Sequence, residues 1–482
     1  MSIMVSLKQI KNMKKKNLLL FVLLTAVLLL RAQNYGEYYR QLPVDMSCPS
    51  LPDIPDYTVS VSDFGGVGDG VTLNTEAFRK AISCLEKHGG GHLVVPAGVW
   101  MTGMISLKSH IDLHLEKNAI VMAAPDKALF IKEENGRKEN KCTPLITASK
   151  RSDISITGEG VIDGNGAFWR PVKRAKVSDV EWKTFLDMGG TVVEDGKLWF
   201  PFNLKHDANV AETAERQEQM RPHLIRLTDC ERIYIKGVTL QNSPKFHLIP
   251  TRCRQVVVDG VTIRCPWNAQ NGDALDISSC KDVLIVNNMI DAGDDGICMK
   301  AGAGKSGVGA GPCENILIEN NAVFHAHGGF VIGSEYSGGM KNIVVRNNRF
   351  CGTDTGLRFK SGVGRGGKTE NIYISDIFMT DIKDEAIVFE CTYVDKKYSV
   401  KDEAGKVTVA KDAPFVPEFT DIHINRVVCR NAKVAVKAHG LQGFDCVHGV
   451  SIDNSTFFYT QKDKDLDGNV QLDFGNTQFY TY

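Results

Sequence analysis

Acidic residues that could catalyse a hydrolysis gather in the second half of this 482-residue chain. They belong to four short motifs, which are Asn271-Gly272-Asp273, Gly293-Asp294-Asp295-Gly296, His327-Gly328-Gly329 and Arg358-Phe359-Lys360. Cleavage of a glycosidic bond needs one carboxylic acid to protonate the leaving oxygen and one carboxylate to activate water or attack the sugar. Crowded carboxylates cannot all ionise easily, so one of Asp273, Asp294 and Asp295 can stay protonated. Arg358 and Lys360 would suit an anionic group of the substrate.

Each of these motifs alone is weak, because Asp-Asp-Gly is common in turns and Arg-x-Lys on solvated strands. Their position within a repeat makes them stronger. Asp294 and His327 each lie 11 residues after the start of an apolar tripeptide. Equivalent positions of stacked coils lie about 4.8 Å apart, so these two side chains are predicted to be neighbours. Arg358 and Lys360 are two residues apart in a strand-like segment and therefore point to one face.

The apolar tripeptide recurs along the chain and marks short strands. Its copies begin at Ile154, Ile233, Val256, Val283, Ile316, Ile343, Ile372, Ile422 and Val450. From Ile233 to Ile372 the starts lie 23 to 33 residues apart, with polar turn residues between them. This range is typical of a solenoid built from short strands and turns. Alternation along each strand places one side chain inside and the next outside.

Asparagine and cysteine residues keep the same registration. Asparagine pairs begin four residues after a tripeptide start, at Asn287, Asn320 and Asn347. Because asparagine tolerates the left-handed turn conformation, stacked coils would align these amides in a ladder. Four cysteines lie three residues before a start and are predicted to stack as a column of thiols: Cys230, Cys253, Cys280 and Cys313. None of the 13 cysteines forms a C-x-x-C pair, which excludes a zinc ribbon or a thioredoxin-type motif.

The helical signal is clearest near the start of the repeats. Asn74 is expected to cap a helix that runs to about Lys87, and this helix would cover the first coil. Its apolar face would hold Ala77, Phe78, Ala81, Ile82 and Leu85. The segment 164–220 interrupts the repeat with charged residues and three tryptophans, Trp169, Trp182 and Trp199. We therefore expect an N-terminal extension over 33–62 and one domain over 63–482, with insertions near 164–220 and 394–415.

Residues 1–32 are predicted to be a signal peptide. Three lysines precede the apolar run Leu18–Leu30, whose length suits a signal peptide and is short for a membrane span. Export to the periplasm or the extracellular space is expected, with no stable membrane insertion after signal removal; an N-terminal membrane anchor is the alternative. Basic and acidic residues balance at 57 each, so the charge gives no reason to expect a nucleic-acid partner.

Together the four motifs resemble the signatures of glycoside hydrolase family 28, the polygalacturonase family. Other segments are similar to patterns of the same family, namely Asp63–Gly70, Val95–Gly98, Gly158–Gly164 and Asn242–Pro244. Gly272 stands where the family usually has threonine, and Ala326 where it usually has glycine. The resemblance runs from about Asp63 to the final coils. It implies an all-β fold, the right-handed parallel β-helix.

The resemblance also implies an inverting mechanism with a role for each polar residue. Asp294 would be the general acid, and Asp273 and Asp295 would activate water. His327 would tune the acid. The galacturonate unit would be bound by Arg358, Lys360 and Asn271. No cofactor or metal is expected, because no set of His, Asp and Glu residues near the motifs has the spacing of a catalytic metal site.

The expected activity is hydrolysis of α-1,4-galacturonosyl linkages in pectic polysaccharide or its oligosaccharides. Exo action is expected because exo-acting members of the family carry comparable insertions, and here 164–220 precedes the catalytic coils. One alternative substrate is rhamnogalacturonan or a substituted galacturonan. A calcium-dependent pectate lyase is a second alternative, and a non-catalytic glycan-binding β-solenoid is a third.

Overall fold

The computed structural model describes residues 34–134, 137–201, 218, 220–393, 397–401 and 407–482. It divides into two compact units, Met1–Cys48 and Pro49–Tyr482. In the first unit, the described residues include one short 3₁₀ helix, η1 (Tyr35–Tyr39). All described strands belong to the second unit. The predicted signal peptide, residues 1–32, lies outside the described residues.

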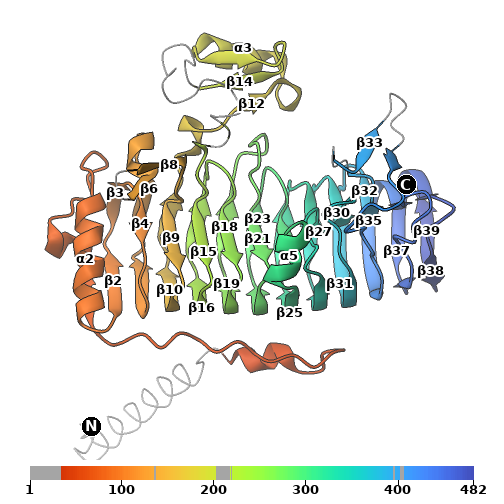
Figure 1. The fold of residues 1–482 in the computed structure, drawn as a ribbon, viewed down its shortest axis with the longest axis horizontal. Helices are drawn as coiled ribbons and strands as arrows, with labels where there is room; N and C mark the ends of the chain where they lie inside the picture. Colours follow the sequence, from red (N-terminus) through yellow and green to blue (C-terminus); the bar gives the residue numbers. More distant parts are fainter. Residues whose placement is uncertain (1–33, 135–136, 202–217, 219, 394–396, 402–406) are drawn as a thin grey trace, which may run out of the picture. The chain divides into compact units, whose positions relative to one another are not determined.

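The second unit is a right-handed parallel β-helix, as the family resemblance implied (Figure 1). Each coil adds one strand to each of three parallel ladders. The first ladder contains β4 (Ile105–Ser106), β9 (Ile146–Ser149), β15 (Ile225–Thr228), β18 (Leu248–Thr251), β21 (Leu275–Ser278), β24 (Ile297–Lys300), β27 (Gly328–Gly333), β30 (Thr355–Lys360) and β32 (Glu385–Glu390). This ladder positions the candidate site.

The second ladder is the longest and contains the apolar tripeptides. Its strands are β1 (Thr58–Ser60), β2 (Gly91–Val95), β5 (Ile111–Leu115), β10 (Ser152–Gly158), β16 (Glu231–Lys236), β19 (Arg254–Asp259), β22 (Lys281–Val286), β25 (Cys313–Glu319), β28 (Met340–Arg346), β31 (Thr369–Thr380), β35 (Ile422–His439), β36 (Val450–Asp453) and β38 (Leu472–Gly475). Adjacent tripeptides pair residue by residue, for example Ile154 with Ile233 and Val283 with Ile316. The predicted registration is confirmed.

The third ladder consists mainly of short strands. They are β3 (Gly98–Thr102), β6 (Ala119–Ala123), β11 (Val161–Asp163), β17 (Thr239–Gln241), β20 (Thr262–Arg264), β23 (Met289–Asp291), β26 (Ala322–Phe324), β29 (Arg349–Cys351), β37 (Thr456–Leu466) and β39 (Gln478–Thr481). The long strands β31 and β35 bend to serve more than one ladder. Because each coil repeats the three ladders in the same order, the turn from the third ladder to the first lies at the same edge of every coil.

The interior of the β-helix contains the two columns that the sequence predicted. Asn288 donates to Asn321 at 2.8 Å, and Asn321 donates to Asn348 at 3.0 Å. These amides also bond to buried backbone groups, which satisfies polar atoms that have no access to water. The four stacked cysteines are buried, and all are free thiols.

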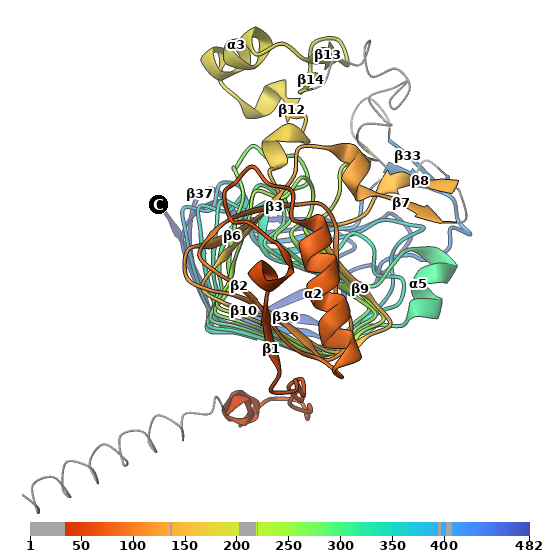
Figure 2. The same cartoon turned by 90° about the vertical axis from the view of Figure 1, so that its left-hand side faces the viewer.

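Helix α2 (Thr75–Lys87) lies across the N-terminal end of the coil stack, as predicted (Figure 2). The five apolar residues of its predicted face are all buried. Asn74 precedes the helix but does not cap it with its side chain. Its amide oxygen instead accepts from the backbone N–H of Val67 at 2.7 Å, so Asn74 fixes the Gly-rich turn before the helix. The first strand, β1, already lies within the range 33–62 that the sequence assigned to an extension.

The insertion near 164–220 contains more regular structure than its sequence indicated. Helix α3 (Asp179–Asp187) and a small antiparallel sheet form within it: β12 (Val172–Lys173), β14 (Leu198–Phe200) and β13 (Thr191–Val193). Trp199 is buried among the apolar residues of this subdomain, and Trp169 is buried in the main core. A capping box of Ser178 and Glu181 begins α3, and this Ser-x-x-Glu signal was present in the sequence. Most of the helix-prone run 208–219 lies outside the described residues.

Three other excursions leave the coils. The hairpin of β7 (Ile131–Glu134) and β8 (Arg137–Cys142) precedes β9. Helix α5 (Gly304–Ala310) follows β24. The second predicted insertion, 394–415, contains a short antiparallel pair, β33 (Ser399–Lys401) and β34 (Val407–Val409). Among the described residues, no helix is both long and apolar enough to span a bilayer.

Candidate active site

The four motifs converge at the edge where the third ladder turns into the first. Asp273 precedes β21, Asp294 and Asp295 precede β24, and His327 precedes β27. Arg358 and Lys360 lie within β30. Because the strands are parallel and in register, motifs separated by 20 to 30 residues in the chain become neighbours in space.

Asp294 and His327 form the contact that their registration predicted. Nδ1 of His327 lies 3.0 Å from Oδ1 of Asp294. Lys176, from the insertion, lies with Nζ 3.3 Å from Nε2 of His327 and 3.2 Å from the carbonyl oxygen of Gly293. Oδ2 of Asp354 lies 3.7 Å from the same Nε2, so the His327 ring contacts two carboxylates and one lysine.

Asp295 is held by the two cations of β30. Nζ of Lys360 lies 2.6 Å from Oδ2, and Nη1 of Arg358 lies 3.4 Å from Oδ1. The Asp295 side chain is 1% exposed, and burial alone would raise its pKa. The charges of Lys360 and Arg358 outweigh burial and leave its pKa below the usual range. Arg358 also donates to the hydroxyl of Tyr393 at 3.1 Å, which fixes the guanidinium.

The pKa values of Asp273 and of its neighbour Asp276 are raised, in contrast to that of Asp295. Both are buried. Burial raises the pKa of Asp273 well above its usual range, and the nearby Asp276 and Asp294 add to the effect. Burial likewise raises the pKa of Asp276 to about 7, although Lys300, 3.9 Å away, opposes it. The raised pKa values of the cluster therefore lie on this side.

Asp294 lies between these two extremes. Burial raises its pKa, but the hydrogen bond from His327 and the charge of Lys360 leave the net pKa lowered. Burial, with the neighbouring Asp276 and Asp294, thus raises the pKa of Asp273, whereas the net pKa of Asp294 is lowered.

Asn271 lies at the rim of the cluster with a left-handed backbone, φ 54°. Its side-chain oxygen accepts from Nη2 of Arg221 at 2.8 Å. Arg221 also donates to the carbonyl oxygens of Pro244 and Gln270, so one buried guanidinium ties together the turns of three coils. Asn271 is therefore positioned by a residue at the end of the insertion.

Asp294, Asp295 and His327 offer potential metal-ligand atoms that all lie within 4.8 Å of one another. The expectation that no such set lies near the motifs is therefore wrong. Sequence spacing could not reveal the set, because its members come from two coils. Ammonium groups already contact two of the three ligands: Lys360 contacts Asp295, and Lys176 contacts His327.

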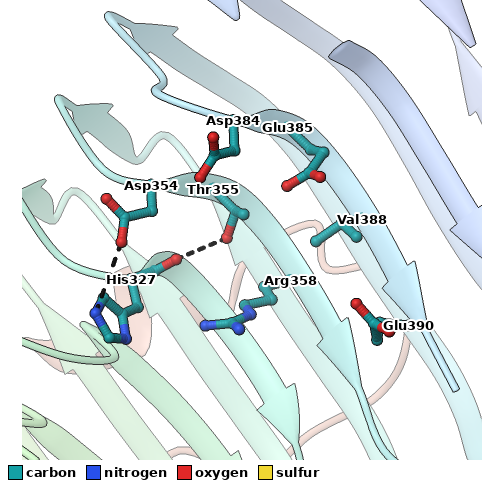
Figure 3. Close-up of a pocket in the computed structure, with 8 residues that line it drawn as sticks. All are labelled: His327, Asp354, Thr355, Arg358, Asp384, Glu385, Val388 and Glu390. Carbon is teal, nitrogen blue, oxygen red and sulfur yellow. Dashed lines mark hydrogen bonds and ion pairs between the residues drawn. The ribbon is translucent and has the colours of Figure 1, made fainter. Parts of the chain in front are cut away.

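A cavity of about 230 Å³ opens on the C-terminal side of the cluster (Figure 3). We call it the acidic cavity; it is lined by His327, Asp354, Thr355, Arg358, Asp384, Glu385, Val388 and Glu390. Three of its carboxylates have lysine partners at 2.7 to 3.0 Å, which are Lys383 for Asp354, Lys433 for Asp384 and Lys437 for Glu385. The lining thus offers hydrogen-bond acceptors with reduced net charge.

Five residues near the cluster were not identified from the sequence: Lys176, Arg221, Asp276, Lys300 and Tyr393. Asp276 and Lys300 occupy outward positions of first-ladder strands, so the strand alternation could have indicated them. Lys176, Arg221 and Tyr393 come from or beside insertions that do not follow the repeat. The spacing of the repeats could not identify residues of this kind.

The comparisons with known proteins agree with this geometry. The model for "Glycosyl hydrolases family 28" matches residues 183–415. A probable polygalacturonase from Vitis vinifera is 30% identical over 460 residues, covering 92% of this chain and 82% of the relative. An exo-poly-alpha-D-galacturonosidase from Dickeya chrysanthemi is 29% identical and covers 72% of this chain and 59% of its own length.

A solved structure shares both fold and sequence with this chain. The hyperthermoactive exopolygalacturonase from Thermotoga maritima superposes with a TM-score of 0.72 at 29% identity, covering 90% of this chain and 94% of the other. The family match and these relatives define the class of the protein as a glycoside hydrolase. The chain belongs to glycoside hydrolase family 28.

Proposed function

We propose that the enzyme hydrolyses α-1,4-galacturonosyl linkages in pectic polysaccharide or its oligosaccharides, by an inverting and exo-acting mechanism. The observation that carries the proposal is the contact of Arg358 and Lys360 with Asp295, the residue that follows Asp294 in the chain. Two fixed cations next to the reacting groups suit a sugar that itself has a carboxylate. The polygalacturonase names of the relatives support this substrate class.

In the proposed reaction, Asp294 donates its proton to the glycosidic oxygen as the bond from that oxygen to the anomeric carbon breaks. A water molecule attacks the anomeric carbon from the opposite face, and Asp273 or Asp295 accepts its proton. The products are a sugar with a free anomeric hydroxyl and a sugar with a new alcohol. His327 positions Asp294 through the 3.0 Å contact.

Substrate binding supplies the protonation state that Asp294 needs. A uronate carboxylate beside Lys360 would offset one of the charges that lower the pKa of Asp294, although the hydrogen bond from His327 lowers it more. The pKa of Asp294 would then rise in the complex. A second assignment, with Asp273 as proton donor, is favoured by the raised pKa of Asp273 in the unliganded site.

The stereochemical outcome has a direct test. Inverting pairs usually lie about 6.5–9.5 Å apart and retaining pairs about 5–5.5 Å, whereas oxygens of Asp294 and Asp295 approach within 4.8 Å. We still favour inversion, because the resemblance to family 28 implies it and Asp273, on the neighbouring coil, offers a second candidate base. Proton NMR of the first product should show inverted configuration, and a retained anomer would contradict the proposal.

Exo action is supported by the reach of the insertion. Lys176 extends from it to His327 and Gly293, so the subdomain of α3 and β12–β14 touches the catalytic coils. A polymer that crosses the cluster would have to pass this subdomain. Digestion of polygalacturonate should release one small product from the outset with slow loss of viscosity. An early ladder of mixed oligomers would indicate endo action.

A second substrate class is favoured by the acidic cavity. Its carboxylates are suited to accept hydrogen bonds from sugar hydroxyls rather than to bind another carboxylate. A neutral sugar beside the cleaved galacturonate, as in rhamnogalacturonan or a substituted galacturonan, would fit that side. Product analysis on defined oligosaccharides of both classes decides between them.

Activity should survive exhaustive chelation, because Lys360 and Lys176 contact the potential ligand set that Asp294, Asp295 and His327 form. Calcium-dependent activity with an unsaturated product that absorbs in the ultraviolet would indicate a lyase instead. Export of the enzyme, based on residues 1–32, stays a prediction that N-terminal sequencing of the mature protein would check.

A further inference from the structure

A second cavity, which we call the basic cavity, lies on the first ladder toward its N-terminal end. Its volume is about 340 Å³. Six of its lining residues are basic: Lys132, Lys141, Arg221, His223, Arg226 and Lys245. The remaining lining residues include no carboxylate; they are Cys142, Thr143, Pro144, Thr147 and Thr228. The catalytic motifs contribute none of these residues.

The cavity shares its face of the sheet with the catalytic cluster. Arg226 points outward from β15, between the buried Ile225 and Leu227. It pairs in register with Thr147 of β9 on one side and with Ile249 of β18 on the other. Strand β15 is three strands from β24, which corresponds to about 14 Å. This distance is on the order of three sugar rings.

Two buried nitrogen atoms in the cavity lack a partner among the described residues: Nδ1 of His223 and Nε of Arg226. A buried polar atom without a hydrogen bond usually marks a place for a missing ligand or water. Burial and the neighbouring Lys245, Arg226 and Arg221 lower the pKa of His223 to about 3, so its imidazole is neutral. The local field is positive even without a charge on His223.

The charges are only partly compensated. Glu218 pairs with Arg221 and lies 3.9 Å from Lys245. For Arg226, Lys132 and Lys141, no carboxylate partner is found within the described parts of the chain. A chain whose formal charges balance thus gathers, on this face, three cations for which the described residues provide no carboxylate partner.

We propose that the basic cavity binds the carboxylate of a uronate unit two to three sugars from the cleaved bond. Arg226 offers the planar fork that recognises a carboxylate, and Lys141 and Lys132 approach from the β7–β8 hairpin. The enzyme would then select substrates by length on this side. The inference rests on the proposed function, because it takes the substrate to be a galacturonide.

The test compares kcat/KM for di-, tri- and tetragalacturonate. In Arg226→Gln, the preference for tetra- over digalacturonate should fall about tenfold or more, because a charge-assisted contact is lost. Lys141→Gln, an exposed position that folding tolerates, should reduce the same ratio several-fold. Arg254→Gln, an exposed arginine on the second ladder, is the matched control and should leave the ratio unchanged.

Binding provides a readout that does not need turnover. Calorimetry with the Asp294→Asn variant should show that Arg226→Gln weakens binding of tetragalacturonate more than of digalacturonate. Equal losses for both lengths, or competition by inorganic sulfate without any change in length preference, would overturn the assignment. The two failures are distinguishable: a wild-type enzyme that cleaves no galacturonide overturns the proposed function, whereas equal losses overturn only the cavity's role.

Discussion

The two cavities that flank the catalytic cluster differ in how their charges are balanced. In the acidic cavity, three of four carboxylates have lysine partners. In the basic cavity, Arg226 and two lysines of the lining have no such partner among the described residues. Unpaired charge attracts a polyanion, whereas paired charge contributes hydrogen-bonding geometry. One groove face can therefore recognise different sugars on its two sides.

The difference comes in part from single outward positions of the first ladder and in part from the β7–β8 hairpin, which adds Lys132 and Lys141 to the basic cavity. Arg226, Asp276, Arg358 and Val388 occupy one outward row, on β15, β21, β30 and β32. The inward rows stay aliphatic because they fill the core. Recognition can thus change from coil to coil without any change of fold.

The largest expected effect concerns the cluster between the two cavities. Asp294→Asn should reduce kcat by about 10²–10⁴, because a positioned acid is lost. The loss should be the same for short and long substrates, since neither cavity is altered. Steady-state kinetics on di- and tetragalacturonate check this, with the exposed Asp445→Asn as control. Near-normal turnover would rule out Asp294 as the acid, and a comparable loss in Asp273→Asn alone would support Asp273.

The next effect concerns the cation that faces the acidic cavity. Arg358→Gln should raise KM for galacturonides about 10- to 100-fold, because a charge-assisted hydrogen bond to the substrate is removed. The pKa of Asp295 should also rise, because Arg358 is one of the three charges that lower it, with Lys360 and Lys300. The ionised form of Asp295 stabilises the folded state. As pH falls, the variant would lose this stabilisation at a higher pH than the wild-type enzyme. Kinetics across pH measure both changes, and an unaltered KM would place the uronate elsewhere.

A smaller effect is expected for the residue that joins the insertion to the cluster. Lys176→Met removes the contact to Nε2 of His327, so His327 should hold Asp294 less firmly. We therefore expect kcat to fall up to about tenfold and the pH–rate profile to change. Lys173→Met, an exposed lysine of the same insertion, is the control. An identical profile would mean that Lys176 has no positioning role.

The smallest effect concerns the charge of the acidic cavity itself. Glu390 lines it and lacks an arginine or lysine partner in the described parts of the chain. Glu390→Gln should lower KM for galacturonides two- to fivefold, since one screened repulsion is removed. The gain should vanish at high salt. Glu370→Gln, on the second ladder, is the control, and a higher KM would mean that Glu390 binds a sugar hydroxyl.

Much of the fold could be predicted, because the β-helix repeats a local pattern. The tripeptides, the asparagine ladder and helix α2 all follow from spacing and alternation. The structure of the insertion near 164–220 was harder to predict from the sequence. Helix α3 lies outside the repeat, and its capping box was the only local signal for it. Asn74 is the N-cap residue of α2 as predicted, but its side-chain oxygen accepts from the backbone N–H of Val67 and makes no bond to the helix.

By itself, the sequence determined the coil register and therefore which motif residues meet. Asp294 reaches His327, and Arg358 and Lys360 share a face, because a strand period of two and a regular coil leave no other arrangement. The tertiary structure alone decided the protonation pattern of the cluster, the approach of Lys176 and the basic cavity. These depend on burial and on contacts between coils and insertions, and electrostatic energies change with distance and desolvation that no sequence spacing encodes.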